Sequence, residues 1–492
     1  MSEGMNLMKR SYKVFCSKAA KSSLPLICAV FIFGFEHRLS AEPNDNATRD
    51  AAAQPIAQRI LGDQELRDVL HRAKSILGNG FNAGDGYSQV WIRDFSTFME
   101  LSCEVNNPVL IKENLLRFFE FQGADGNIPD GFQKVNGSYV TNKNTVETDQ
   151  ESSLIQAIYK YVQKTGDVSV LTVTIDGRTV LERMELALEF LLKNRFSEKY
   201  GLLWGATTAD WGDIQSESDP GLNLDEKTHK AIDIYDNAMF MVAVSDYLSF
   251  LKHDPRHFVR WHSIYAAVKK NSRNYLWDRK KNKFIPHLYL DGSPFPASFD
   301  EREVYYHGGT AVGIEAGLLS KKEIVISLSK MISNVRNSGA PSIGLSIYPC
   351  YPKGFFQNPA MTPYCYQNGG DWTWWGGRMI QQLIKHDLIE EAYREIKPMV
   401  KRVEHDNGFY EWYSIDNKPM GSGTYRGAAG VLGKAIEMLL AWAEAHSNAQ
   451  SPDGPISQGA PRPFMMTRAR ICQRPAKSQA YRDWTGGSCG PW

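Results

Sequence analysis

The chain has 492 residues, of which 42% are hydrophobic and 23% are charged, and its formal net charge is +1. These fractions are typical of a globular protein and exclude a largely disordered chain. The small net charge argues against a dedicated nucleic-acid binder, which usually carries a basic stripe and a high pI. The composition therefore favours a neutral ligand.

The first 41 residues have the pattern of an export signal. A basic stretch between Lys9 and Lys21 precedes an apolar run over residues 24–35, and the small residue Ala41 stands before Glu42. An apolar run of about 12 residues is short of the roughly 20 that cross a bilayer. We therefore predict a signal peptide over residues 1–41, a secreted or periplasmic protein, and no membrane attachment after cleavage.

The far end of the chain, residues 449–492, is rich in Pro, Gly and Arg and shows no apolar period. Such a segment buries too little surface to offset the entropy of ordering, so we predict a disordered tail. One catalytic domain over residues 42–448 remains. Its cysteines have no CxxC spacing, which argues against a zinc finger. Cys350 and Cys365 flank a Pro/Gly-rich loop and are read either as a disulfide or as ordinary thiols.

Between residues 51 and 446 the apolar residues recur with the period of a helix, and polar loops separate the runs. One face combines Leu154, Ile158 and Val162, and each such face needs a neighbouring helix to cover it. The runs come in pairs, so the sequence predicts an all-α fold. They lie near residues 54–78, 95–106, 108–122, 150–165, 178–195, 233–251, 255–277, 305–317, 320–336, 371–386, 387–404 and 424–446.

The loops between these helices hold dense clusters of Trp, Tyr, Asp, Glu and Gly. Aromatic faces stack on the apolar faces of sugar rings, while carboxylates and amides bind their hydroxyl groups. Most of the 12 Trp and 22 Tyr belong to the core, but core packing gives less reason for aromatics in loops. The clusters therefore indicate a sugar site. They cover residues 84–94, 125–132, 204–217, 364–377 and 407–427.

Two of these loops carry carboxylates beside aromatic residues, as hydrolysis of a glycosidic bond requires. One carboxylic acid protonates the leaving oxygen, and a second carboxylate activates water or attacks carbon. In residues 204–213, Asp210 and Asp213 flank Trp211, whose apolar bulk favours a protonated acid. In residues 408–413, aromatic residues flank Glu411. A turn or helix cap is the alternative role for either aspartate, and a surface position is the alternative for Glu411.

A third motif, Trp91-Ile92-Arg93-Asp94, precedes a predicted helix, where Asp94 is expected to cap the first turn. Capping is compatible with sugar binding. Further polar residues in or near the loops are candidates for lining the same site. They are Asp125, Asp130, Glu147, Asp149, Asp236, Asn237, His307, Gln367, Asn368 and Asp371.

These motifs resemble the six-hairpin (α/α)6-barrel glycosidases, which include glucoamylases, trehalases, processing α-glucosidases and the glucosidase part of glycogen-debranching enzymes. The resemblance covers most of residues 51–446 and implies a toroid of six helical hairpins. Trp91-Ile92-Arg93-Asp94 matches the Trp-x-Arg-Asp segment that binds the terminal sugar in glucoamylases. Those enzymes invert the anomeric centre.

The resemblance also implies roles for the carboxylates. The family acid follows Trp in a loop after a middle hairpin, which favours Asp213 over Asp210, although the order of Asp, Trp and Gly differs here. The family base is a Glu before the last helix, as is Glu411. The segment 366–372 resembles the loop that walls the terminal-sugar pocket, which implies an exo-acting enzyme. The residues predicted to bind substrate are Trp91, Arg93, Asp94, Asp149, Trp211, Asp236, Asn237, His307, Gln367, Asn368, Asp371 and Trp372.

We therefore predict an inverting exo-glycosidase that releases a terminal sugar from an oligosaccharide, with glucose as the favoured sugar. The alternative is a polysaccharide lyase or sugar epimerase on a similar barrel, with Tyr306 and His307 moving the proton. A sugar-binding protein without catalysis would not need paired carboxylates, and a phosphorylase would not need Glu411. No cofactor is predicted, and the spacing of the loop carboxylates does not specify calcium. The sequence does not give the oligomeric state.

Overall fold

The computed structural model describes residues 44–252 and 254–447. The chain divides into two compact units, Met1–Arg49 and Asp50–Trp492, and the fold and the site presented here belong to the second. The predicted signal peptide over 1–41 and the predicted tail over 449–492 lie outside the described residues, and both stay predictions. No helix in the described part of the chain combines the length and the apolar character needed to cross a membrane.

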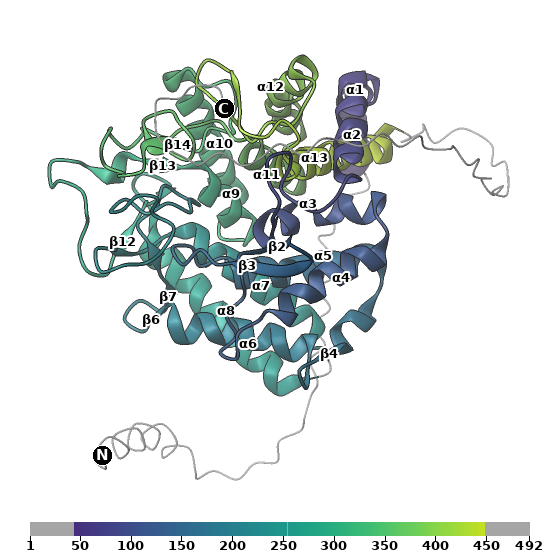
Figure 1. The fold of residues 1–492 in the computed structure, drawn as a ribbon. Coiled ribbons are helices and arrows are strands. Elements are labelled where there is room, and N and C mark those ends of the chain that lie inside the picture. Colours follow the sequence, from purple (N-terminus) through teal and green to yellow (C-terminus); the bar gives the residue numbers. More distant parts are fainter. Residues whose placement is uncertain (1–43, 253, 448–492) are drawn as a thin grey trace, which may run out of the picture. The chain divides into compact units, whose positions relative to one another are not determined.

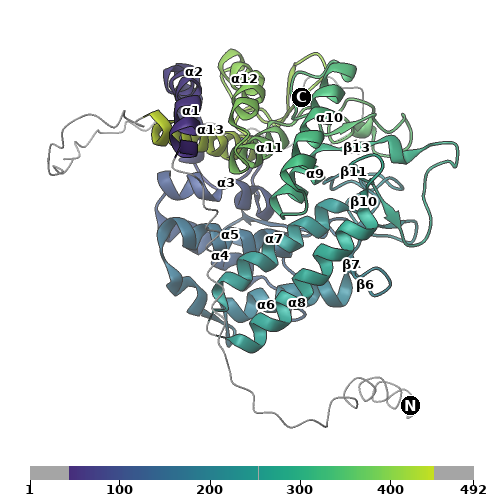
Figure 2. The same ribbon diagram turned by 180° about the vertical axis from the view of Figure 1, so that it is seen from behind.

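Helices dominate the second unit, as Figures 1 and 2 show from opposite sides, and the prediction of a mainly helical chain is confirmed. Most predicted runs agree with one helix each, but the run over 54–78 is two helices that meet at Asp63. The described residues form thirteen α-helices: α1 (Asn44–Gly62), α2 (Gln64–Leu77), α3 (Ile92–Val105), α4 (Pro108–Glu120), α5 (Gln150–Thr165), α6 (Val180–Asn194), α7 (Ile234–Phe250), α8 (Pro255–Asn271), α9 (His307–Glu315), α10 (Lys321–Ser338), α11 (Thr373–Lys385), α12 (Ile389–Asp406) and α13 (Arg426–Ser447).

Local sequence signals set several helix ends. Thr179 begins α6 with a capping box, in which its side chain and that of Glu182 each bind the other's backbone N–H. A proline at the first position opens α4 and α8, where its missing N–H costs nothing. Gly166 ends α5 in the left-handed conformation that favours glycine.

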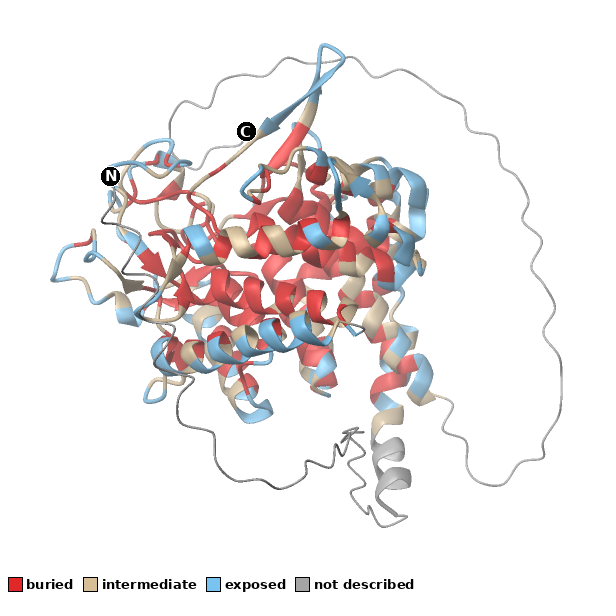
Figure 3. Cartoon of the chain, turned by 90° about the horizontal axis from the view of Figure 1, so that it is seen from below, coloured by how far each residue is buried: buried red, intermediate tan, exposed pale blue. Residues whose placement is uncertain are grey.

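The odd-numbered helices from α3 to α13 form a closed ring. Each of α3, α5, α7, α9 and α11 contacts the next, and α13 contacts both α11 and α3. The helices between them in sequence pack outside this ring: α4 and α6 contact α5, α8 contacts α7, α10 contacts α9, and α12 contacts α11. The ring helices α7 and α9 are therefore buried on nearly every side, and Figure 3 shows the buried residues gathered in the central helices.

Sixteen short strands lie in the connections of the described chain and pair only antiparallel. Three-stranded sheets have the orders β1-β2-β3 and β12-β9-β8, and the others are two-stranded. Their bounds are β1 (Val90–Trp91), β2 (Gly131–Val135), β3 (Ser138–Asn142), β4 (Thr174–Ile175), β5 (Arg178–Thr179), β6 (Phe196–Ser197), β7 (Leu202–Leu203), β8 (Gly205–Ala206), β9 (Lys230–Ile232), β10 (Trp277–Asp278), β11 (Lys283–Phe284), β12 (Leu288–Tyr289), β13 (Tyr305–Tyr306), β14 (Ile347–Tyr348), β15 (Trp412–Tyr413) and β16 (Pro419–Met420).

These strands fix the loops that the sequence singled out. Trp91 pairs with Gly131, where a Cβ would lie 2.6 Å from the Trp91 ring, so only glycine lets the two segments meet. Gly205 pairs with Ala231, and Trp412 pairs with Met420. As a result the aromatic loops are tied to one another near the N-terminal ends of the ring helices.

Candidate active site

A pocket of about 130 Å³ lies where these loops meet the N-terminal ends of α3, α11 and α13. Its walls combine four carboxyl side chains, one arginine and seven aromatic rings. They are Ala83, Tyr87, Trp91, Arg93, Asp94, Asp130, Trp211, Asp213, Tyr366, Trp372, Trp374, Glu411 and Tyr425. Of the predicted catalytic residues, Asp213 and Glu411 therefore share one pocket, together with the predicted binding residues Trp91, Arg93, Asp94, Trp211 and Trp372.

Glu411 stands just before β15, and its carboxyl is buried, with 6% of the residue exposed. Burial raises its pKa to about 7, helped by the nearby Asp94 and Asp213 carboxyls and opposed by a hydrogen bond from Tyr87. The Tyr87 hydroxyl donates to Oε2 at 2.8 Å. A carboxyl group with this pKa, held through one oxygen by a hydrogen bond, can act as a general base near neutral pH.

Gly421 allows this orientation, because its φ of +71° suits glycine and a Cβ there would lie 2.5 Å from Glu411 Oε2. We expect Gly421→Ala to displace the Glu411 carboxyl and to lower kcat for glycoside hydrolysis by about tenfold or more, since catalysis depends steeply on placement. Gly166→Ala is the matched control, because Gly166 has the same φ but open space around it. Equal losses in both variants would show that backbone strain, not the carboxyl, explains the effect.

Asp213 stands in the loop between β8 and β9 and is half-buried. Its Oδ1 accepts a hydrogen bond from Gln367 Nε2 at 2.6 Å, and its backbone oxygen accepts one from Asn144 Nδ2 at 3.0 Å. The side chain and the backbone of this aspartate are thus held from two different segments of the chain.

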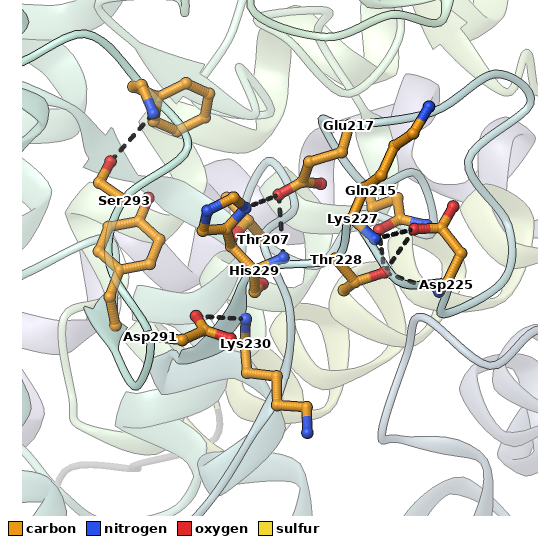
Figure 4. A network of polar contacts seen from close by, with 12 residues as sticks. Thr207, Gln215, Glu217, Asp225, Lys227, Thr228, His229, Lys230, Asp291 and Ser293 are labelled. Atoms are coloured by element: carbon orange, nitrogen blue, oxygen red, sulfur yellow. Dashed lines mark hydrogen bonds and ion pairs between the residues drawn. The ribbon is translucent and has the colours of Figure 1, made fainter.

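A polar network anchors the rest of the Asp213 loop between β8 and β9 (Figure 4). Glu217 Oε1 accepts from the backbone N–H of His229 at 3.1 Å and contacts its Nδ1 at 3.0 Å. Thr228 donates to Gln215 Oε1 at 2.6 Å, and Thr207 N–H donates to the His229 carbonyl at 3.1 Å. The loop is therefore closed on itself on both sides of Asp213, which fixes the carboxyl without its lying in a helix or strand.

Asp210, the other candidate acid, does not line this pocket. It is 1% exposed, and its Oδ1 accepts from the backbone N–H of Gly309 at 2.8 Å. Asp210 instead lines a separate cavity of about 10 Å³, together with Asp233 and Asp236. Burial raises the pKa of Asp210 to about 8. The geometry thus favours Asp213 over Asp210 as a group that reaches substrate.

Asp210→Asn is expected to stabilise the protein at alkaline pH. Because the folded-state pKa of about 8 lies above the ordinary 3.8, Asp210 contributes stability that is complete below about pH 4 and is lost as the pH rises through 8. The neutral amide avoids this loss and keeps an oxygen for Gly309. Denaturant unfolding should show the variant gaining on the wild type by about 1 kcal/mol or more between pH 5 and 8.5. A difference independent of pH would contradict this account.

Arg93 and Asp94 begin α3 at the floor of the pocket. Arg93 forms a buried ion pair with Asp149, Nε to Oδ2 at 2.9 Å, and another with Glu147. Trp91 is the N-cap of α3, so the expectation that Asp94 caps the helix is wrong: Asp94 lies inside the first turn. Burial raises the pKa of Asp94 to about 6. Its Oδ1 is buried without a partner, which leaves an acceptor for a ligand hydroxyl.

The aromatic wall is a cluster of indole rings around Trp211. Its ring centroid lies 4.7 Å from that of Trp372 and 5.5 Å from that of Trp374. The Nε1–H groups of Trp211 and Trp374 are buried without partners among the described residues. Apolar ring surface beside free donors and a free acceptor matches the mixed character of a sugar ring with its hydroxyls.

Seven predicted residues lie off the pocket wall, and the contacts of each show what it holds. Asp149 accepts from Arg93 and from the Tyr235 hydroxyl at 2.7 Å, and Gln367 contacts Asp213. Asn237 bonds both backbone groups of Leu203, and Asn368 bonds both of Tyr351. Asp371 binds Arg402 and Ser342. His307 contacts Ile343 and Asn334. Asp236 lines the smaller cavity.

Six pocket residues were not among the predicted catalytic or binding residues: Ala83, Tyr87, Asp130, Tyr366, Trp374 and Tyr425. Ala83 lies just before the first aromatic loop. The other five stand in the aromatic loops, and of these only Asp130 was named, as a general polar candidate. Cys350 is a free thiol, so the reading in which it pairs with Cys365 is wrong. Within the described part of the chain, no group of three or more His, Cys, Asp or Glu side chains is arranged to hold a metal ion.

Solved structures share this fold at low sequence identity. An uncharacterized conserved protein from Thermus thermophilus superimposes with a TM-score of 0.54 and 15% identity, covering 75% of this chain and 98% of that chain. A GH63 mannosylglycerate hydrolase from the same organism, in complex with glucose, gives 0.54 and 14%, covering 75% and 99%. A rhamnosidase from Klebsiella oxytoca with rhamnose bound gives 0.53 and 14%, covering 76% and 64%.

The mannosylglycerate hydrolase and the rhamnosidase are six-hairpin glycosidases, so the resemblance drawn from the sequence motifs is confirmed at the level of the fold. A scan against protein-family models gives no match, and a search among curated proteins gives none either.

Proposed function

We propose that this protein is an inverting, exo-acting glycoside hydrolase whose closed helical ring is an (α/α)6 barrel. The observation that carries the proposal is the meeting of Asp213 and Glu411, from loops 198 residues apart in sequence, on one small pocket with aromatic walls. The fold is shared with structures described as a mannosylglycerate hydrolase and a rhamnosidase, which supports the same class of reaction here.

Asp213 acts as the acid and Glu411 as the base. Asp213 gives its proton to the glycosidic oxygen as the bond from that oxygen to the anomeric carbon breaks. Glu411 takes a proton from a water molecule, whose oxygen bonds to the anomeric carbon from the opposite face. Such an inverting pair stands about 6.5 to 9.5 Å apart, which leaves room for the water. Tyr87 holds Oε2 of Glu411 and so orients the carboxyl group.

The pocket favours a neutral terminal sugar, and glucose is the first candidate. Four carboxyl groups line it, whereas its one cation, Arg93, is paired with Asp149 and Glu147. An anionic sugar would find no free cation to pair with. The volume of about 130 Å³ suits one sugar unit, which supports exo action. We also propose export of the enzyme, on the signal pattern of residues 1–41.

The lyase or epimerase alternative gains no support from the site. Tyr306 and His307 are both buried and lie off the pocket. The Tyr306 hydroxyl bonds that of Tyr351 at 2.6 Å, and His307 is held between Ile343 and Asn334. Burial lowers the pKa of His307 to about 4, which makes it a poor base for proton abstraction near neutral pH.

The test is hydrolysis of matched α- and β-glycosides and glycosyl uronides by the chain from Glu42 onward, with released sugar measured directly. We expect turnover of a neutral glycoside and none of the uronides. Unsaturated products from a uronide, with no hydrolysis of neutral glycosides, would instead establish a lyase.

A further inference from the structure

Gln367 contacts the candidate acid from behind the pocket wall. Its Nε2 donates to Asp213 Oδ1 at 2.6 Å, and the residue is 0% exposed. Gln367 itself does not line the pocket, whereas Asp213 does. The amide of Gln367 therefore acts on Asp213 rather than on a sugar.

The backbone around Gln367 is held rigidly. Ser346 Oγ donates to the Gln367 carbonyl at 2.8 Å and accepts from the Gly369 N–H at 2.9 Å. The next residue, Asn368, accepts from the N–H of Tyr351 and donates to its carbonyl. These bonds fix the position from which the amide reaches Asp213.

The hydrogen bond from Gln367 to Asp213 is kept although the other end of the amide lies in unfavourable surroundings. Gln367 Oε1 is buried without a partner among the described residues, which is unfavourable for a polar atom. Gly212 makes room for it, since a Cβ at that position would lie 2.6 Å from Oε1. A side chain kept only for packing would not need a polar end here.

We propose that Gln367 is the positioning residue for the acid, an inference that rests on the proposed hydrolysis. By binding Oδ1, its amide leaves the proton on Oδ2. As the Oδ2–H bond breaks and the proton passes to the glycosidic oxygen, the bonding electrons stay on the carboxyl group and spread to Oδ1. The hydrogen bond from Gln367 then strengthens, because its acceptor becomes charged. Gln367 thus stabilises the transition state more than the bound substrate.

The kinetic test is Gln367→Met, which keeps the length of the side chain and removes the donor. We expect kcat to fall by about 10- to 100-fold, from the worth of a hydrogen bond to a charged group, with KM changed less than about threefold. The alkaline limb of the kcat profile should move to higher pH, because the carboxylate loses a donor. Gln156→Met, a buried glutamine bonded to the Met239 carbonyl, controls for loss of packing and should leave that limb in place. An unmoved limb in Gln367→Met would overturn the proposal.

A second measurement does not depend on activity. Denaturant unfolding of Gln367→Met, Asp213→Ala and the double variant gives the coupling between the two side chains. We expect a coupling clearly above that of the unconnected pair Gln156→Met and Asp213→Ala, because only Gln367 bonds the Asp213 carboxyl. A coupling no larger than that of the unconnected pair would overturn the proposal. If the wild type hydrolyses no glycoside, the proposed function fails, while the coupling still decides whether Gln367 acts on Asp213.

Discussion

Glu411→Gln is expected to lower kcat for hydrolysis by about 10²- to 10⁴-fold, the usual contribution of a general base. The amide keeps the shape of the side chain and an oxygen for the Tyr87 hydroxyl, but it cannot take a proton from water. In the wild type, the raised pKa of Glu411, about 7, should appear as the acid limb of the kcat/KM profile, because the base must be ionised. Steady-state rates between pH 4 and 9 measure both effects.

The matched control is Glu303→Gln, at an exposed glutamate paired with Lys281 away from the pocket. It should leave kcat unchanged. If Glu411→Gln keeps kcat within about tenfold of the wild type, Glu411 is not the base, and a phosphorylase or another carboxyl must be considered.

Arg93→Met is expected to destabilise the fold by about 3–5 kcal/mol. The substitution leaves the carboxylates of Glu147 and Asp149 buried without their cation, since both lie within the same ion-pair group. Breaking a buried pair from one side costs this much, because the remaining charge is uncompensated. Denaturant unfolding at pH 7 measures the loss.

Two further variants separate charge from packing. Arg59→Met, at an exposed pair with Glu390, should cost no more than about 1 kcal/mol. Adding Asp149→Asn to Arg93→Met should recover part of the stability by removing one unpaired charge. A double variant less stable than Arg93→Met alone would contradict the charge explanation.

Much of the fold was predictable, because each helix buries an apolar face that recurs at a regular spacing. The run that contains Leu154 and Ile158 became α5, and polar loops marked the helix ends. The break between α1 and α2 was missed since Gly62 and Asp63 interrupt the chain without interrupting the apolar pattern. The closure of the ring by α13 against α3 joins distant segments, and no local pattern contains it.

The site was predictable where chemistry is local to a motif. Trp91-Ile92-Arg93-Asp94 and the aromatic flanks of Glu411 identified residues that do meet in the pocket. The residues alone did not distinguish Asp210 from Asp213. The two aspartates are only three residues apart in one loop, and the backbone conformation of that loop determines which carboxyl faces the pocket. The backbone at Asp210 has a φ of +57°, and its side chain meets the backbone of Gly309 instead.

The remaining contacts of the site depend on long-range geometry. Tyr87 meets Glu411 across 324 residues, and Gln367 meets Asp213 across 154. Asn368 and Asp371 stand in the same loop as Gln367, yet their side chains hold the backbone of other segments. A loop rich in polar residues therefore indicates a site but does not separate the groups that reach it from those that support it.

The central claim, that Asp213 protonates the leaving group and Glu411 activates water, is tested most directly by the dependence of rate on the leaving group. Hydrolysis of two glycosides of the same sugar, one with an alkyl and one with a strongly acidic phenol as leaving group, is measured for Asp213→Asn and Glu411→Gln. The account predicts that Asp213→Asn loses the alkyl glycoside but keeps much of its rate on the phenyl glycoside, which needs no proton, whereas Glu411→Gln loses both. Equal losses on the two substrates in Asp213→Asn would contradict it.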